Sequence, residues 1–230
     1  MATEDLSDRP WLLVPGTLCT ADVFDGFLDA LGVPGTKRRY LELSFPSVED
    51  YNADFNDVTE DTVVCGFSLG AIVAAHTADR MRPHSLILFG LNPFADDPDK
   101  AAARHALADD VKAVGGAAAL KSRNPDVYGT TPDQTRAQIY SMADETAHMI
   151  EAQTQLALTR PGALPALSKA RMSVLTLTGT RDTSAPAAQG RAAADAAPLS
   201  RFHALDGLGH FALLEDPAAC AAAISSVEEV

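Results

Sequence analysis

The sequence has little cysteine. Cys19, Cys65 and Cys220 are the only cysteines among its 230 residues. So few thiols, and an odd number of them, argue against the disulfide framework of small secreted proteins and suit a reducing compartment. A chain of this length needs no cross-links, because a domain of about 200 residues buries roughly 70% of the surface that its unfolded chain exposes. We therefore expect a cytoplasmic protein with one main domain.

Long apolar runs are absent as well. Although 47% of the residues are hydrophobic, no stretch approaches the roughly 18 apolar residues that a membrane-spanning helix requires. The first residues, MATEDLSDRP, are polar and acidic, whereas a signal peptide begins with basic residues and continues with an apolar segment. The sequence therefore predicts a protein that does not interact with membranes.

Basic residues are scarce. The chain has 18 lysines and arginines against 31 aspartates and glutamates, which gives a formal net charge of −13 at pH 7. The acidic side chains are mostly scattered along the sequence, as expected for solvated surfaces. Nucleic-acid binding requires a basic patch that meets the phosphates, and the sequence shows none. A nucleic-acid partner is therefore not expected.

Short apolar segments alternate with segments of helical periodicity. The apolar segments predict strands at residues 11–14, 40–43, 62–65, 85–89, 173–178 and 201–205. Helices are predicted at residues 20–31, 47–55 and 72–81, after Pro186, and from Asp216 onward. A chain in which strands alternate with helices forms a mostly parallel sheet flanked by helices. The predicted fold class is therefore α/β.

Residues 95–165 differ from the rest of the chain. They are rich in alanine, show helical periodicity without clear strands, and are divided by Pro98, Pro125, Pro132 and Pro161. We interpret this segment as a helical cap inserted over one edge of the sheet. The predicted core domain then comprises residues 1–94 and 166–230.

The segment VVCGFSLGAIVAA, residues 63–75, places Ser68 between two glycines where a strand should turn into a helix. Such a turn projects the serine hydroxyl outward, and Gly66 and Gly70 allow the backbone to pass closely. The helix after Ser68 directs unbonded N–H groups toward the same point. We interpret Ser68 as a candidate nucleophile, and the alternative is a tight turn without chemistry.

A serine hydroxyl needs a base, and the base needs a group that orients it. His210, in LDGLGHF, lies in a glycine-containing loop after the last predicted strand, from which it can reach the strand ends. Asp182, in LTGTRDT, follows a strand and a glycine turn, at the sheet edge where open parallel sheets bind ligands. The alternatives are a capping histidine, a turn aspartate, and Asp206 as the acid.

Acyl transfer also requires N–H donors for the oxyanion that forms on the substrate. The backbone N–H of Leu69 is one candidate, at the start of the helix that follows Ser68. The second should come from the loop after the first strand, where Thr17 is the first choice and Leu18 the second. Candidates for an apolar substrate pocket, each of them equally suited to the core, are Phe67, Phe94, Tyr128, Met142 and Phe211.

These residues resemble the α/β-hydrolase family. GFSLG matches the GxSxG motif of that family, and the order Ser68, Asp182, His210 matches its order of nucleophile, acid and base. The resemblance implies an eight-stranded, mostly parallel sheet, often with an antiparallel strand near the start, and a pocket between sheet and cap. Pro15-Gly16 stands where many members have His-Gly. Serine rather than aspartate at the elbow argues against the dehalogenase and epoxide hydrolase branches.

The sequence therefore predicts a serine hydrolase that cleaves a small carboxylic ester through an acyl-enzyme on Ser68, with no metal or organic cofactor. Its expected partner is a small-molecule ester or thioester, and the oligomeric state is left open. A thioesterase or acyltransferase would use the same residues, and a hydrolase-fold receptor is a further alternative. The ester is preferred because Arg104, Arg123, Arg136 and Arg160 are dispersed in the sequence and do not suggest a phosphate-bearing partner.

Overall fold

The computed structural model describes residues 6–227, with side chains through residue 224. Its strands are β1 (Trp11–Val14), β2 (Arg38–Tyr40), β3 (Val63–Phe67), β4 (Ser85–Phe89), β5 (Ser173–Gly179) and β6 (Ser200–Leu205). They form one sheet in the order β2-β1-β3-β4-β5-β6, and every neighbouring pair is parallel. The predicted α/β class and parallel sheet are confirmed.

The sheet differs from the one that the resemblance implied. Within residues 6–227 it has six strands instead of eight, and none of them is antiparallel. The described residues ahead of β1 form a short 3-10 helix, Leu6–Asp8, and not a strand. The segment between β2 and β3 forms another 3-10 helix, Val48–Phe55. The connections that could have supplied further strands are therefore helical.

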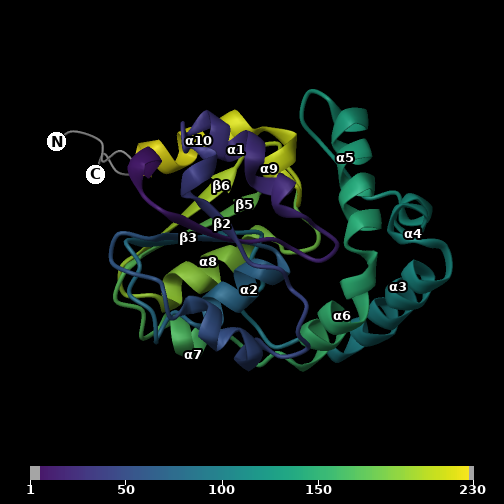
Figure 1. Cartoon of the computed structure of the whole chain (residues 1–230), viewed down its shortest axis with the longest axis horizontal. Helices are drawn as coiled ribbons and strands as arrows, with labels where there is room; N and C mark the ends of the chain where they lie inside the picture. Colours follow the sequence, from purple (N-terminus) through teal and green to yellow (C-terminus); the bar gives the residue numbers. More distant parts are fainter. Residues whose placement is uncertain (1–5, 228–230) are drawn as a thin grey trace.

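Helices cover both faces of the sheet (Figure 1). One face carries α1 (Asp25–Ala30), α9 (Ala212–Glu215) and α10 (Pro217–Val227), and the other carries α2 (Leu69–His76), α7 (Leu164–Leu167) and α8 (Ala187–Ala196). Successive side chains of a strand point to opposite faces. Leu13 and Cys65 accordingly belong to one apolar cluster, and their neighbours Leu12 and Val64 belong to the other. Both faces of the central strands are thus buried.

Some element bounds differ from the predicted ones. The second strand was expected at residues 40–43, but β2 ends at Tyr40, and only the N–H of Leu41 continues the pairing with Leu13. β2 is an edge strand with partly exposed residues, so its apolar pattern is weak. The helix expected at residues 72–81 runs from Leu69 to His76 instead.

The cap lies between β4 and β5. It contains a 3-10 helix, η5 (Pro98–Lys100), and the helices α3 (Ala101–Val114), α4 (Gly116–Arg123), α5 (Pro132–Glu145) and α6 (Ile150–Thr159). Figure 1 shows these helices beside one end of the sheet. Their small apolar cluster includes Ala108, Ala143 and Ile150, and Leu18 of the core packs into it. The expected boundary at residue 165 falls inside α7, which packs against α2 and α8 of the core.

The order of the strands defines where a site can form. From β1 the chain moves to β2 on one side of the sheet and then to β3 on the other side. In open parallel sheets, ligands bind outside the carboxyl ends of the strands at such a reversal. The residues that follow these ends are 15–18 after β1 and Ser68 after β3. Within residues 6–227, no helix combines the length and apolar character needed to span a bilayer.

Candidate active site

Ser68 lies on a strained turn between β3 and α2. Its backbone has φ 52° and ψ −116°, a left-handed conformation that residues other than glycine rarely adopt. A Cβ on Gly66 would lie 2.6 Å from the Cα of Ala71, and one on Gly70 would lie 2.0 Å from the carbonyl oxygen of Val14. Both glycines are therefore required by the close approach of backbone segments around Ser68.

His210 connects the hydroxyl of Ser68 to the carboxylate of Asp182. His210 Nε2 lies 3.0 Å from Ser68 Oγ, and His210 Nδ1 lies 2.8 Å from Asp182 Oδ2. Because an ionised carboxylate only accepts hydrogen bonds, Nδ1 is the nitrogen that donates, and Nε2 is left to accept from the serine. The structure thus brings together the three residues that the sequence singled out, and we call them the candidate triad.

Asp182 is fixed by the backbone around it. Its side chain is 1% exposed, and Oδ1 accepts hydrogen bonds of 2.8 Å from the N–H groups of Ser184 and Ala185. The alternative acid, Asp206, is exposed, and its Oδ1 lies 3.5 Å from the hydroxyl of Thr180. Asp182 is therefore the acid that faces His210.

Gly90 packs against His210 and Asp182 of the candidate triad, and the sequence analysis did not identify it. It follows β4 and has φ +58°, and a Cβ there would lie 3.1 Å from His210 Cε1 and 3.5 Å from Asp182 Oδ2. A glycine that immediately follows a buried strand is the signal that could have identified it. The imidazole also lies near two aromatic rings, with centroid distances of 5.2 Å to Phe67 and 5.6 Å to Phe211.

Glu215 is a second buried carboxyl group near His210, and it was also missed. It is 4% exposed, and its Oε2 accepts a hydrogen bond of 2.5 Å from the N–H of Gly209. Burial raises the pKa of Glu215, while the N–H of Gly209 acts in the opposite direction. Because Gly209 precedes His210, this bond anchors the loop that carries the histidine. The sequence around it, LLEDPAA, has no feature that distinguishes it from an exposed helix start.

The two candidate N–H donors next to Ser68 are those of Thr17 and Leu69. Both residues line the same cavity as Ser68, and neither N–H has an acceptor among residues 6–227. A Cβ on Gly16 would lie 3.0 Å from Ser68 Cβ, so the loop after β1 lies against the serine. The N–H of Leu18, by contrast, donates to Gln153 Oε1 of α6 at 3.0 Å.

Two cavities meet at His210. One of about 110 Å³ contains Thr17 and Ser68, and another of about 240 Å³ contains Tyr128 and Phe211; both include His210 and Ser184. Both also contain charged side chains, namely Lys100, Arg104 and Arg160 in the smaller and Arg123, Asp126 and Arg181 in the larger. The arginines that are dispersed in the sequence are therefore partly gathered around the site.

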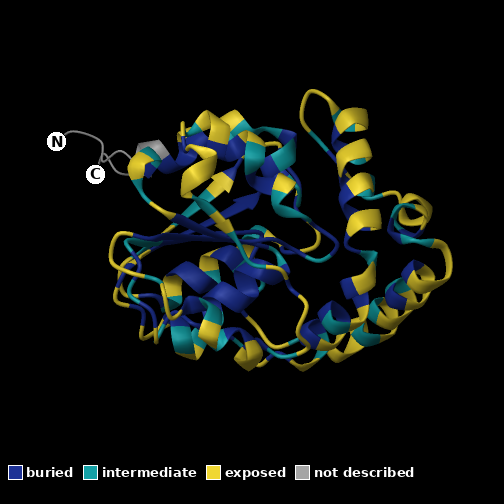
Figure 2. Ribbon diagram, viewed as in Figure 1, coloured by how far each residue is buried: buried dark blue, intermediate teal, exposed yellow. Residues whose placement is uncertain are grey.

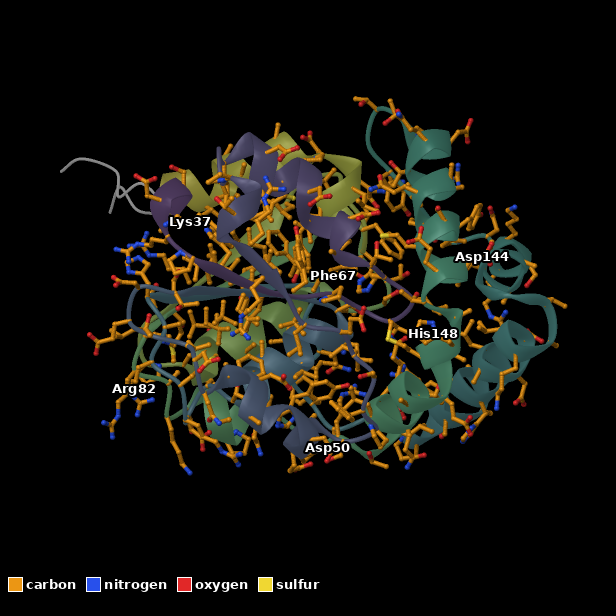
Figure 3. The ribbon with its side chains drawn as sticks, in the orientation of Figure 1. Lys37, Asp50, Phe67, Arg82, Asp144 and His148 are labelled. Atoms are coloured by element: carbon orange, nitrogen blue, oxygen red, sulfur yellow. The ribbon has the colours of Figure 1, made fainter. Side chains whose placement is uncertain are left out.

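The other predicted pocket residues, Phe67, Met142 and Phe94, line neither cavity. Phe67 is buried in the core and lies near the middle of the molecule in Figure 3. Met142 belongs to the same apolar cluster as Phe67, with 1% exposure. Phe94 is 44% exposed. His148 of the cap is exposed, and its Nδ1 lies 3.2 Å from the carbonyl oxygen of Glu145. Across residues 6–227, no three His, Cys, Asp or Glu side chains form a group suited to a metal ion.

Comparisons with known proteins agree with this architecture. An esterase from Thermogutta terrifontis, solved with malate bound, is 20% identical, with a TM-score of 0.79 over 96% of this chain and 89% of that one. An enol-lactonase from Burkholderia xenovorans is 20% identical, with a TM-score of 0.73 over 97% and 91% of the two chains. An esterase from Exiguobacterium antarcticum is 17% identical, with a TM-score of 0.79 over 97% and 93%.

These identities establish a shared fold and nothing finer. No curated protein sequence matches the chain. The model of the alpha/beta hydrolase family, however, matches residues 10–223, which span the sheet, the cap and all of the candidate triad. The protein therefore belongs to the α/β-hydrolase family.

Proposed function

We propose that the protein is a serine esterase that cleaves small carboxylic esters through an acyl-enzyme on Ser68. The observation that carries this proposal is the chain of contacts from Ser68 Oγ to His210 Nε2 and from His210 Nδ1 to Asp182, at 3.0 and 2.8 Å. Distances in this range let a base remove the serine proton as the hydroxyl attacks. The serine also lies in a cavity, where a substrate can reach it.

The reaction proceeds in two stages. His210 Nε2 accepts the proton of Ser68 while Oγ attacks the ester carbonyl carbon, and the same proton then passes to the departing alcohol as its C–O bond breaks. Water enters, gives a proton to His210, and attacks the acyl-enzyme, which releases the acid and returns the proton to Ser68. Asp182 stays ionised throughout and stabilises the protonated imidazole.

The tetrahedral intermediates carry a negative oxygen next to the carbonyl carbon. The free N–H groups of Thr17 and Leu69 stabilise it, and Leu69 also begins α2, whose N-terminus carries partial positive charge. One such donor contributes about 3 kcal/mol to the stability of the transition state in a comparable hydrolase. The alternatives of a thioesterase or an acyltransferase would use the same groups, so only their substrates and products separate them from an esterase.

Other observations support a small ester and a reducing compartment. The cavity at Ser68, about 110 Å³, and the adjoining one at His210, about 240 Å³, are each smaller than the roughly 300 Å³ at which pockets for drug-sized ligands begin. The structural relatives named above include two esterases and an enol-lactonase. The three cysteines are free and buried, which fits the proposed cytoplasmic location.

The test is hydrolysis of p-nitrophenyl acetate, butyrate and octanoate by the wild type, Ser68→Ala and Ser168→Ala, with Ser168 as a surface control far from the site. We expect the wild type to prefer the shorter esters and Ser68→Ala to lose at least about 10⁴-fold in kcat. Ser168→Ala should behave like the wild type, and a fluorophosphonate should label every protein that keeps Ser68. Turnover that survives in Ser68→Ala would refute the proposed nucleophile.

A further inference from the structure

Three cationic side chains of the cap converge on the cavity that contains Ser68. Lys100 lies at the end of η5, Arg104 in the first turns of α3, and Arg160 just after α6. Among the described residues that line this cavity, these three are the only lysines or arginines, and none is an aspartate or glutamate. We call Lys100, Arg104 and Arg160 the basic subsite. It stands out because the whole chain carries a net charge of −13.

Arg160 is buried without enough partners. Its side chain is 1% exposed. Nη1 contacts Asp96 Oδ1 at 3.1 Å and also donates to the carbonyl oxygen of Ala157. Its Nε is buried and has no acceptor among residues 6–227. A buried donor without an acceptor is costly, so the guanidinium can gain from a further oxygen ligand.

The positive charge of the subsite is only partly neutralised. Asp96 is shared by two arginines, because Arg104 also binds it through Nε at 2.7 Å and Nη2 at 2.6 Å. Burial alone would raise the pKa of Asp96, but the two guanidinium groups outweigh burial and lower it. Lys100 has no carboxylate partner within the described chain. Within the described chain, Asp96 is therefore the only carboxylate that pairs with any of these three cations.

An ion-pair network that only stabilised the cap would not need a third cation at the cavity. Asp96 with two arginines already ties the start of the cap to its end, and Lys100 adds nothing to that link. Burial lowers the pKa of Arg160, as does the nearby charge of Arg104, whereas Asp96 raises it. An anion in the cavity would add a second negatively charged partner for the three cations.

We propose that the basic subsite binds a carboxylate of the substrate, so that the esterase prefers esters that carry a free carboxylate close to the scissile bond. This inference rests on the proposed function, because the anion is placed by the same cavity that contains Ser68, Thr17 and His210. The apolar wall formed by Leu69, Ile72 and Ala157 fits a short hydrocarbon link between the two groups. The substrate class is therefore half-esters of short dicarboxylic acids or esters whose alcohol bears a carboxylate.

Two pairs of esters test whether a negative charge on the substrate raises the rate. The members of each pair differ by one methyl group. Mono-p-nitrophenyl adipate and its methyl ester differ in charge on the acyl side, and 4-acetoxybenzoate and its methyl ester differ on the alcohol side. We expect the wild type to have the higher kcat/KM for the charged member of at least one pair, by about tenfold or more. The pair that shows the preference identifies the side on which the carboxylate binds. Preference for the neutral member in both pairs would overturn the proposal.

Variants of the basic subsite test whether it causes the preference for charged esters. Arg104→Gln and Lys100→Gln remove charge at side chains that are not fully buried, which avoids disrupting the buried Arg160. The matched controls are Arg136→Gln, whose arginine is similarly exposed and also pairs with an aspartate, Asp133, and Lys112→Gln on α3. We expect the charged-to-neutral ratio of kcat/KM to fall about tenfold in Arg104→Gln. An unchanged ratio in both subsite variants would refute the assignment.

A binding measurement without turnover tests the carboxylate subsite independently of the proposed esterase activity. Titration calorimetry of Ser68→Ala should detect monomethyl adipate and not dimethyl adipate, and the added change Arg104→Gln should weaken the first by about tenfold. If the wild type hydrolyses no ester but this binding pattern appears, the subsite stands and the esterase proposal fails. If neutral esters are hydrolysed but the monoester neither binds nor reacts faster than its methyl ester, the esterase stands and the subsite is refuted.

Discussion

The two sides of the cavity at Ser68 are constructed differently. On the core side, each member of the candidate triad follows a strand and a turn, and backbone groups hold it in place. On the cap side, the basic subsite comes from separate helices, and its two arginines are held by ion pairs with Asp96. The comparison teaches that the proposed chemistry depends on local turns, whereas the proposed selectivity depends on how distant segments pack.

The core and the cap also differ in how many apolar side chains they bury. All residues of β1 and β3 are buried, and two large apolar clusters cover the faces of the sheet. The cap has a much smaller cluster of its own, and Figure 2 shows that the outer faces of its helices are largely exposed. A region with few buried apolar contacts opens more readily than a core. Changes on the core side should therefore affect catalysis most strongly, and changes on the cap side should have graded effects.

The largest effect should come from Asp182→Asn. The amide oxygen can still accept from Ser184 and Ala185, but the NH₂ group then faces His210 Nδ1. The imidazole would adopt the tautomer whose Nε2 carries a proton and cannot accept one from Ser68. We expect kcat for p-nitrophenyl butyrate to fall by about 10⁴-fold, measured by steady-state kinetics. Asp206→Asn, the exposed acid of the histidine loop, is the control, and an equal loss there would contradict the assignment.

A smaller loss should follow Gly90→Ala. The new methyl group would lie 3.1 Å from His210 Cε1, so the ring would have to shift by a few tenths of an ångström. Because a displacement of about 1 Å reduces rates roughly 100-fold, we expect a smaller loss in kcat. The positive φ adds a backbone cost of about 1–2 kcal/mol in the free energy of unfolding. Gly32→Ala separates the two effects, because Gly32 has φ +73° and only Ser7 nearby, at 3.9 Å. Thermal unfolding should shift in both variants, but kcat should fall only in Gly90→Ala.

The cap should influence the core through one hydrogen bond. Gln153→Ala removes the acceptor of the Leu18 N–H, so the neighbouring Thr17 is no longer held in position. The loss of a buried hydrogen bond of this kind corresponds to about tenfold in kcat if it acts on the transition state. Gln155→Ala, an exposed glutamine on the same helix, is the matched control. If KM rises in Gln153→Ala while kcat is unchanged, Gln153 does not position the loop for the reaction.

The smallest effect concerns the pH dependence of stability. Burial raises the pKa of Glu215, so the folded protein holds this proton to a higher pH than the unfolded chain does. The free energy of unfolding should therefore decrease as the pH rises from about 4.5 through the raised pKa. Glu215→Gln keeps an acceptor for Gly209 but removes the ionisable group. Its Tm should exceed that of the wild type at pH 7, and by less at pH 4, in thermal melts at both pH values.

The sequence identified the residues that follow from local patterns. Ser68 and its two glycines, Asp182 and His210 each lie beside a glycine turn after an apolar strand, and such turns depend on neighbours in the sequence. Glu215 could not be identified in this way, because its role depends on a loop that folds back onto a short helix. The arginines of the cap were interpreted as dispersed because Arg104 and Arg160 are brought together only by the packing of α3 against α6.

The bond between Leu18 and Gln153 limits how freely this protein can be recombined with its relatives. The loop after β1 is anchored in the cap, both through this bond and through the Leu18 side chain in the apolar cluster of the cap. A chimaera that received a foreign cap would therefore inherit a misplaced oxyanion donor as well as a new binding surface. Cap exchange should succeed only when the incoming helix provides an acceptor for Leu18 and a space for its side chain.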